Sequence, residues 1–285
     1  MQSLWMVAAS LLFACMGICV KLGSAQFSAA ELVFYRGFVA MLLLFAYVRV
    51  AGLSLRTPYW RAHLTRGVAG FVSLVMYFYA ISQIPLATAV TLNYTSPLFL
   101  ALLLAFWQRE RIRPLLFASL AAGFAGVALL LQPSFHSEEI AGGLFGLGSG
   151  IIASIAYLNV RRLGELGEPE WRTVFYFSLI AAVGGLPWVL VGHPFHAIDG
   201  RGAWLLTGVG AFGALAQLCM TRAYSRGRTM VAASLAYSTV VFASIFGNWL
   251  WQDSLPLLAW VGVGLIVASG VLSGALSRGA PVEQD

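Results

Sequence analysis

The chain has 285 residues and a formal net charge of +6, and 60% of its residues are hydrophobic while only 10% are charged. Because soluble domains are on average roughly half apolar and a quarter charged, this composition excludes an ordinary soluble domain and predicts a protein solvated by lipid. The positive charge does not indicate a nucleic-acid partner, since the sequence has no basic stripe with interleaved aromatic residues. The three cysteines have neither disulfide nor metal-ligand spacing, and we expect no metal site and no cofactor.

Ten apolar runs follow one another along the chain. Each run is long enough for a helix of about 20 residues, the length that crosses the hydrocarbon core of a bilayer. Lipid offers no hydrogen-bond partner to an open backbone, so continuous helices are the expected structure. We therefore predict an all-α integral membrane protein with ten transmembrane helices. The expected spans are 3–21, 29–49, 64–81, 86–107, 115–132, 142–160, 171–191, 203–220, 230–251 and 256–276.

A stretch in the first half, residues 80–131, returns in weaker form at 223–274, an offset of 143 residues. The shared landmarks carry more weight than the overall identity, because a tyrosine, a hydroxyl pair and an acidic residue recur in register. These landmarks are Tyr94 with Tyr237, Thr95–Ser96 with Ser238–Thr239, and Glu110 with Asp253. We therefore predict two repeats of five spans each, residues 1–134 and 135–285.

Five spans per repeat is an odd number, so the second repeat enters the membrane with the opposite orientation. Inverted repeats that meet near the membrane midplane are the architecture of many secondary transporters. In such a protein, exchanging the conformations of the two repeats opens the site to the other side. The predicted inverted five-helix repeats thus favour a carrier.

Basic residues in the connections between spans predict the topology. Fourteen of the 17 lie in alternate connections and in the C-terminal tail, whereas the other side has only Lys21 and Arg201, and Arg36 lies inside a span. The fourteen are Arg49, Arg56, Arg61, Arg66, Arg109, Arg111, Arg113, Arg161, Arg162, Arg172, Arg222, Arg226, Arg228 and Arg278. By the positive-inside rule, both termini and these connections face the cytoplasm. We expect a multi-pass protein of the bacterial cytoplasmic (inner) membrane.

Polar side chains inside spans are costly in lipid and are therefore the first candidates for function. Several lie near the middle of span 86–107, where Pro97 frees a carbonyl and is expected to kink the helix. Span 230–251 has no matching proline, so we expect an asymmetric site. Aromatic hydroxyls together with amides favour a flat, polar organic substrate that resembles an amino acid or a nucleoside. The candidate substrate-binding residues are Tyr77, Asn93, Tyr94, Ser96, Tyr157, Gln217, Tyr237 and Ser238.

A structural role is the alternative for the hydroxyl residues of span 86–107. Thr88, Thr91 and Thr95 recur at helical spacing, and a threonine in a helix can donate to a carbonyl one turn back. Asn93 and Tyr94 fit this alternative less well, because their larger polar groups need partners outside the helix.

Arg36 is the one strong charge well inside a predicted span, and a buried guanidinium needs a partner. One interpretation makes Arg36 the counter-ion of an anionic substrate group, and the other makes it a structural clamp on helix ends or carbonyls. Glu31, five residues earlier, is an acidic candidate near the outer boundary. Glu110 and Asp253 end their spans on opposite sides of the membrane and are candidates for proton coupling or gating, with interfacial ion pairs as the alternative.

Glycines recur at four-residue intervals in span 142–160, at Gly142, Gly146 and Gly150. Small residues at this spacing let helices approach closely, so we predict packing faces here. Glycine faces also permit a homodimer.

Two five-span repeats, the motif ELVFYRG around Arg36 and the run PLATAVTLNYTSPLF followed by an acidic residue together resemble the drug/metabolite transporter superfamily, EamA type. The resemblance covers essentially the whole chain. It implies a ten-helix inverted-repeat fold with cytoplasmic termini and a central cavity, and family members export amino acids and drugs or move metabolites. ELVFYRG and IPLATAV are also similar to the branch of S-adenosylmethionine uptake carriers. The second half departs from the pattern, with Asp253 where Glu is usual and Val240 opposite Pro97.

We therefore predict a secondary transporter that moves a small polar organic metabolite, such as S-adenosylmethionine or an aromatic amino acid, across the lipid bilayer by alternating access. A passive channel or a membrane scaffold is the alternative. An intramembrane enzyme has the least support, because the spans contain no catalytic cluster and all four histidines fall in predicted loops. Protons are the default coupling ion, since no sodium-binding constellation is evident.

Overall fold

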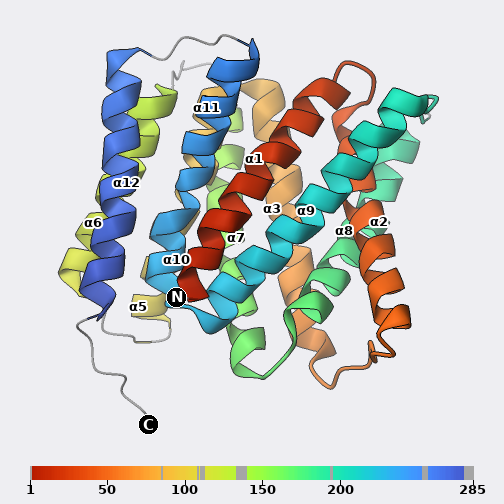
Figure 1. Ribbon diagram of the computed structural model, residues 1–285, viewed down its shortest axis with the longest axis horizontal. Helices are drawn as coiled ribbons and strands as arrows, with labels where there is room; N and C mark the ends of the chain where they lie inside the picture. The colour runs from red at the N-terminus through yellow and green to blue at the C-terminus, as the bar shows by residue number, and fades with distance from the viewer. Residues whose placement is uncertain are drawn as a thin grey trace.

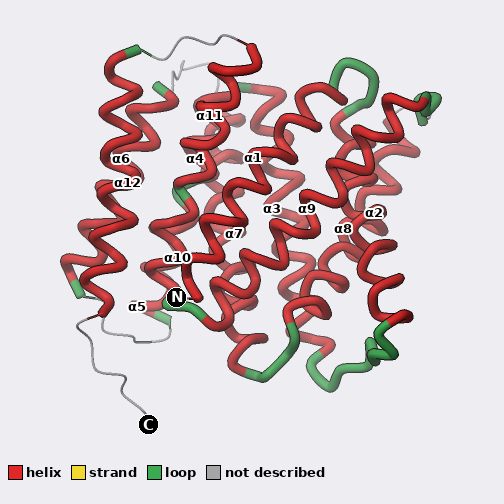
Figure 2. The backbone as a smooth tube through the Cα atoms, viewed as in Figure 1, coloured by secondary structure: helices red, strands yellow, loops and turns green. Residues whose placement is uncertain are grey.

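The computed structural model describes residues 2–84, 86–107, 109, 113–132, 140–192, 195–251 and 256–278. Over these residues every regular element is a helix, and the helices form a bundle (Figure 1, Figure 2). A 3-10 helix, Gln2–Leu4, precedes the α-helices. These are α1 (Trp5–Gly23), α2 (Ala29–Val50), α3 (Trp60–Gln83), α4 (Leu86–Asn93), α5 (Ser96–Phe106), α6 (Pro114–Leu131), α7 (Ile140–Glu165), α8 (Glu170–Gly192), α9 (Gly200–Arg226), α10 (Thr229–Ala236), α11 (Ser238–Trp251) and α12 (Leu257–Arg278).

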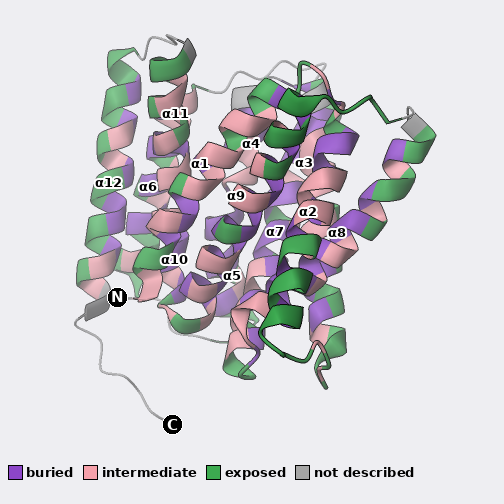
Figure 3. Cartoon of the chain, turned by 45° about the vertical axis from the view of Figure 1, so that its right-hand side comes forward, coloured by how far each residue is buried: buried purple, intermediate pink, exposed green. Residues whose placement is uncertain are grey.

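Each predicted span coincides with one helix or with a pair of short consecutive helices. By length and hydropathy, nine segments of the described residues are able to cross a membrane. Large apolar side chains remain outside the packed core, among them Trp249 (76% exposed) and Leu257 (83% exposed). Buried residues lie on the faces turned toward neighbouring helices, and exposed ones on the outer faces (Figure 3). An apolar outer surface of this kind suits lipid, so the prediction of a multi-pass helical membrane protein is confirmed.

The helix ends divide between two ends of the bundle. The start of α1, the end of α12 and the α2–α3 and α7–α8 connections lie at the same end (Figure 1). The α1–α2 connection lies at the opposite end. The arginine-rich connections of the described residues thus gather on the side of the bundle where the chain begins.

Both spans that carry the repeat landmarks are interrupted near their middle. The first breaks at Tyr94 and Thr95, between α4 and α5, and the second at Tyr237, between α10 and α11. Pro97 in the first turn of α5 explains the first break. The second occurs without a proline, so the interruption is common to both halves. Corresponding hydroxyls satisfy the carbonyls released there, with Thr95 Oγ1 donating to Leu92 O (2.5 Å) and Ser238 Oγ to Leu235 O (2.6 Å).

The glycine stripe of α7 packs against the first of these breaks. A Cβ on Gly150 would lie 2.8 Å from the carbonyl oxygen of Leu92, and one on Gly146 would lie 3.0 Å from the Leu92 side chain. A Cβ on Gly142 would likewise lie 2.8 Å from the Cβ of Gln83, the last residue of α3. The prediction that these three glycines form a packing face is therefore confirmed. The face contacts other helices of the same chain.

Helices α6 and α12 meet through a second pair of glycines. A Cβ on Gly262 would lie 2.6 Å from the carbonyl oxygen of Gly126, and the reverse distance is 2.7 Å. Buried serines join the two helices, with Ser119 Oγ donating to Ser269 O (2.9 Å) and Ser269 Oγ donating to Ser119 O (2.7 Å). In lipid, close backbone approach and interhelical hydrogen bonds are the main sources of helix association.

Replacing Gly262 by Ala is expected to lower the thermal unfolding temperature of the detergent-solubilised protein. The added Cβ cannot be accommodated without separating α12 from α6, at a cost of about 1–3 kcal/mol. Gly264→Ala on the same helix is the matched control, because nothing lies within 4 Å of its Cβ position and alanine favours the helix by about 1 kcal/mol. Equal unfolding temperatures for the two variants would contradict this packing.

Candidate substrate site

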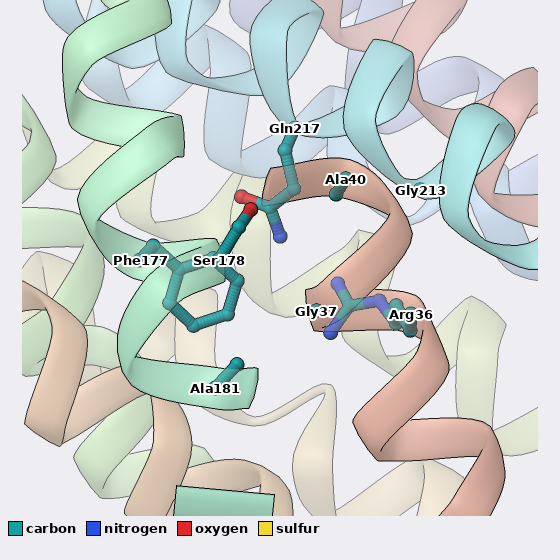
Figure 4. A pocket seen from close by; sticks show the side chains of 8 residues that line it. All are labelled: Arg36, Gly37, Ala40, Phe177, Ser178, Ala181, Gly213 and Gln217. Carbon is teal, nitrogen blue, oxygen red and sulfur yellow. The ribbon is translucent and has the colours of Figure 1, made fainter. Parts of the chain in front are cut away.

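Arg36 lies two turns from the start of α2, and its side chain lines a small cavity between α2, α8 and α9. Glycine at the next position lets α2 approach α8, since a Cβ on Gly37 would lie 2.8 Å from the backbone nitrogen of Ala182. The side chains of Arg36, Phe177 and Gln217 converge on the space between the three helices (Figure 4). The residues that line the cavity are Arg36, Gly37, Ala40, Phe177, Ser178, Ala181, Gly213 and Gln217.

The Arg36 guanidinium has no protein counter-charge among the described residues. Its Nε is buried without a hydrogen-bond partner, and no described acidic group forms an ion pair with it. Its described contact with a ring is to Phe177, whose centroid lies 5.7 Å from the Arg36 Cζ. If Arg36 were a structural clamp, its guanidinium would donate hydrogen bonds to helix ends or carbonyls. No such bond is found among the described residues.

Glu31, the acidic residue nearest in sequence, is committed elsewhere. Its carboxylate accepts hydrogen bonds from Ser28 N (2.8 Å) and His196 N (2.7 Å). The same carboxylate lies 2.8 Å from His196 Nδ1. Together with the bond from Glu31 N to Ser28 Oγ, this forms a capping box at the start of α2. Glu31 therefore joins the first turn of α2 to the α8–α9 connection and does not pair with Arg36.

Arg66 is a second arginine inside the bundle, and its assignment to a loop was wrong. Helix α3 begins at Trp60, four residues before the predicted span, so Arg66 lies in the second turn and is only 3% exposed. Arg66 Nη2 donates to Gln217 Oε1 (3.2 Å), while Arg66 Nε has no partner among the described residues. The residues before it read as a charged connection, which concealed the helix start.

Phe177 links the two arginines. The Arg66 Cζ lies 4.3 Å from the centroid of its ring and the Arg36 Cζ lies 5.7 Å from it, so the two Cζ atoms are at most about 10 Å apart. Stacking of a guanidinium over an aromatic face is favourable and offsets part of the cost of burying the charge. One face of the candidate site is thus strongly positive.

Buried tyrosines form the other part of the candidate site. Tyr157 stacks on Tyr224 with ring centroids 5.1 Å apart, and Tyr94 lies 6.3 Å from Tyr237. Tyr157 belongs to α7, which packs against α3, the helix of Arg66, and against α9, the helix of Gln217. The hydroxyls of Tyr224 and Tyr237 are buried without a partner in the described part of the chain. Aromatic surface with free hydroxyls suits a ring-bearing or polar organic ligand.

The structure brings some predicted residues to this centre and gives others structural partners. Gln217 lines the cavity, and Ser96 is buried in the first turn of α5. Asn93 Nδ2 instead donates to Ser149 Oγ (2.9 Å), which joins α4 to α7, and Ser238 Oγ donates to Leu235 O across the break between α10 and α11. Tyr77 packs against the core around Ala80 and Ala89. Glu110 and Asp253, the candidates for coupling or gating, lie outside the described residues.

Sequence reasoning missed three residues of the site, Arg66, Tyr224 and Phe177. Tyr224 lay beyond the predicted end of its span, whereas α9 continues to Arg226. A usable signal was present, because Tyr224 follows Gln217 by seven residues, or two helical turns, and shares its face. Phe177 gave no signal, since phenylalanine is an ordinary residue of an apolar span.

A separate charged cluster closes the end of the bundle near the α7–α8 connection. His63 Nε2 lies 3.0 Å from Glu168 Oε2, Thr57 Oγ1 donates to Glu168 Oε1 (2.7 Å), and Arg172 Nη1 lies 3.1 Å from the same carboxylate. Burial raises the pKa of Glu168, but hydrogen bonds from Thr57, His63 and Arg172 outweigh burial and hold the pKa below its ordinary value. His63 is 1% exposed and belongs to α3, so its assignment to a loop was wrong.

The described residues therefore form a multi-pass helical membrane protein with a positive, aromatic centre between its helices. A family model described as "EamA-like transporter family" matches residues 1–132 and again residues 140–274, so the chain belongs to this family. The family is one of transporters and not of enzymes, as expected.

Relatives carry transporter names with different cargoes. The pseudopaline exporter CntI of Pseudomonas aeruginosa is 33% identical over 273 residues, covering 95% of this chain and 94% of its own length. The S-adenosylmethionine uptake transporter of Rickettsia felis is 24% identical over 226 residues, covering 78% and 75%. A crystal structure with 22% identity superposes with a TM-score of 0.87 over 97% of this chain and 98% of its own, which shows the same fold.

Replacing Glu168 by Ala is expected to destabilise the protein by about 3 kcal/mol, because His63 and Arg172 would be left buried without their carboxylate. Thermal unfolding in detergent measures the effect. Glu165→Ala is the control, since its pair with Arg161 is half exposed and is worth less than about 1 kcal/mol. A Glu168→Ala protein as stable as the Glu165→Ala protein would show that the cluster does not hold this end closed.

Proposed function

We propose that the protein is a secondary carrier that moves a small polar organic metabolite across the bacterial cytoplasmic membrane by alternating access. The observation that carries the proposal is Arg36, a cation in the core that lines a cavity and has no described counter-charge, in a chain of a transporter family. A guanidinium in such a place suits the carboxylate of a substrate, which it can bind through two parallel hydrogen bonds. The tyrosines around Tyr157 suit the ring portion of S-adenosylmethionine or an aromatic amino acid.

The two halves of the chain support an inverted-repeat mechanism. The family model matches twice, with boundaries close to those of the proposed repeats 1–134 and 135–285. Corresponding helices of the two halves also make corresponding contacts. Helix α3 of the first half packs on α7 of the second, and α9 of the second half packs on α1 of the first. Helix α2 packs on its counterpart α8, and α6 on its counterpart α12. A carrier needs two such interlocked units, because its site opens when they exchange conformations.

A passive channel is the alternative function. A channel requires a continuous polar path, whereas the cavity beside Arg36 is small and is lined mainly by apolar residues, namely Gly37, Ala40, Phe177, Ala181 and Gly213. The largely apolar lining therefore favours a carrier over an open pore.

We also propose that the arginine-rich end faces the cytoplasm. The α2–α3 connection belongs to this end, and the α1–α2 connection to the opposite one (Figure 1). Anionic lipids and the insertion machinery retain arginines on the cytoplasmic side, which supports this orientation.

Single cysteines test the orientation. In a variant whose Cys15, Cys19 and Cys219 are replaced by alanine, exposed positions in the two connections are changed in turn to cysteine, Ser24→Cys and Ala51→Cys. A membrane-impermeant maleimide is expected to label Ser24→Cys in intact spheroplasts and Ala51→Cys only after lysis. The reverse pattern would place the termini outside.

Counterflow in proteoliposomes tests the carrier. Radiolabelled S-adenosylmethionine and phenylalanine are offered to wild type, Arg36→Ala and Arg49→Ala, where Arg49 is an exposed arginine on the same helix. Saturable counterflow by wild type and Arg49→Ala, with at least a tenfold loss in Arg36→Ala, is the expected result. Non-saturable flux through wild type would instead identify a channel.

A further inference from the structure

The acidic residues of the described part of the chain all have partners other than Arg36 and Arg66. Five belong to the described residues, and each has its own partner there. These are Glu31 with His196, Glu165 with Arg161, Glu168 with His63 and Arg172, Glu170 with Arg226, and Asp199 with Gly202 and Gln26. The charges of Arg36 and Arg66 are therefore not neutralised by any carboxylate of the described residues.

Two like charges share this site. Both guanidinium groups lie against Phe177, at most about 10 Å apart, and each repels the other. Burying one charge without a partner is already costly, and the repulsion of a second adds to that cost because the surroundings have a low dielectric constant. One negative charge on a ligand would compensate only half of this excess.

We propose that the substrate is a dianion, with one anionic group bound by Arg36 in the cavity and a second anionic charge compensated by Arg66 beside it. This inference rests on the proposed carrier function and narrows its substrate class, so that a dianion is expected to be carried better than S-adenosylmethionine or phenylalanine. A dicarboxylate or a phosphate monoester supplies the required charge. An aromatic amino acid or S-adenosylmethionine, each with one carboxylate and at least one positive charge, supplies less.

The polar groups beside the arginines fit such a ligand. Gln217 presents Oε1 to Arg66, so its amide NH₂ is left to donate toward the cavity that it lines. Ser178 adds a hydroxyl to the same wall. Among the groups that surround the cavity, donors thus outnumber acceptors, as anion recognition requires.

Binding to the purified full-length protein in detergent tests the proposal by calorimetry. N-acetylglutamate carries two carboxylates, and N-acetylglutamine has the same shape with one carboxylate replaced by an amide. Wild type is expected to bind N-acetylglutamate at least tenfold more tightly than N-acetylglutamine. Glycerol 3-phosphate is the probe for a phosphate monoester, and tighter binding of this probe than of N-acetylglutamate would assign the dianion to that source.

Variants then assign the two charges. Arg36→Gln and Arg66→Gln are each expected to weaken binding of the preferred dianion at least tenfold and to remove the discrimination against N-acetylglutamine. Arg66→Lys keeps the charge and should retain part of the affinity, which separates a charge effect from misfolding. Arg61→Gln, at an exposed position on the same helix, should bind as wild type does.

Three results would overturn the proposal. They are equal affinity for N-acetylglutamate and N-acetylglutamine, unchanged affinity in Arg66→Gln, and no binding of either dianion to folded wild type. Counterflow of phenylalanine that neither dianion inhibits would support the carrier function and contradict the dianionic substrate. Tight dianion binding without counterflow of that dianion would retain the binding site and remove the carrier.

Discussion

Two guanidinium groups inside a lipid-embedded bundle without a described carboxylate are the constraint on which the rest of this structure depends. Arg36 and Arg66 come from the first half of the chain, whereas Phe177 and Gln217 come from the second. The site therefore exists only when the two halves interlock. A cation in such a position is tolerated where ring faces, oriented amides and a ligand replace water.

Close helix packing holds these charges in place. Gly37 lets α2 approach the backbone of α8, and Gly210 makes room for Val39 on the opposite side, so that α2 lies between α8 and α9. Larger residues at either glycine would push the helices apart and move Arg36 away from Phe177. The motif FYRG thus combines the charge with the small residue that positions it.

The hydroxyl groups at the two helix breaks show how far sequence reasoning reached. Tyr94 and Tyr237 were placed in register from the repeat, and they lie together in the structure. Thr95 donates to a carbonyl of the preceding turn, which was the structural alternative for the threonines of span 86–107. Ser238, predicted to bind substrate, makes the corresponding bond at the second break. Arg66 was missed because it stands at the charged start of its apolar run and was counted with the connection, and Tyr224 because α9 continues as a helix beyond its apolar run. Hydropathy shows which part of a helix lies in lipid, but it does not show where the helix begins and ends.

The sequence by itself determined the multi-pass helical membrane architecture and the family, because long apolar runs and short motifs can be read directly along the chain. The partners of each polar side chain were decided only by the tertiary structure. Glu31 binds His196, 165 residues away, and Arg66 binds Gln217, 151 residues away. Such pairings depend on which helix faces meet in the folded bundle, since sequence spacing indicates only which residues share a face of the same helix.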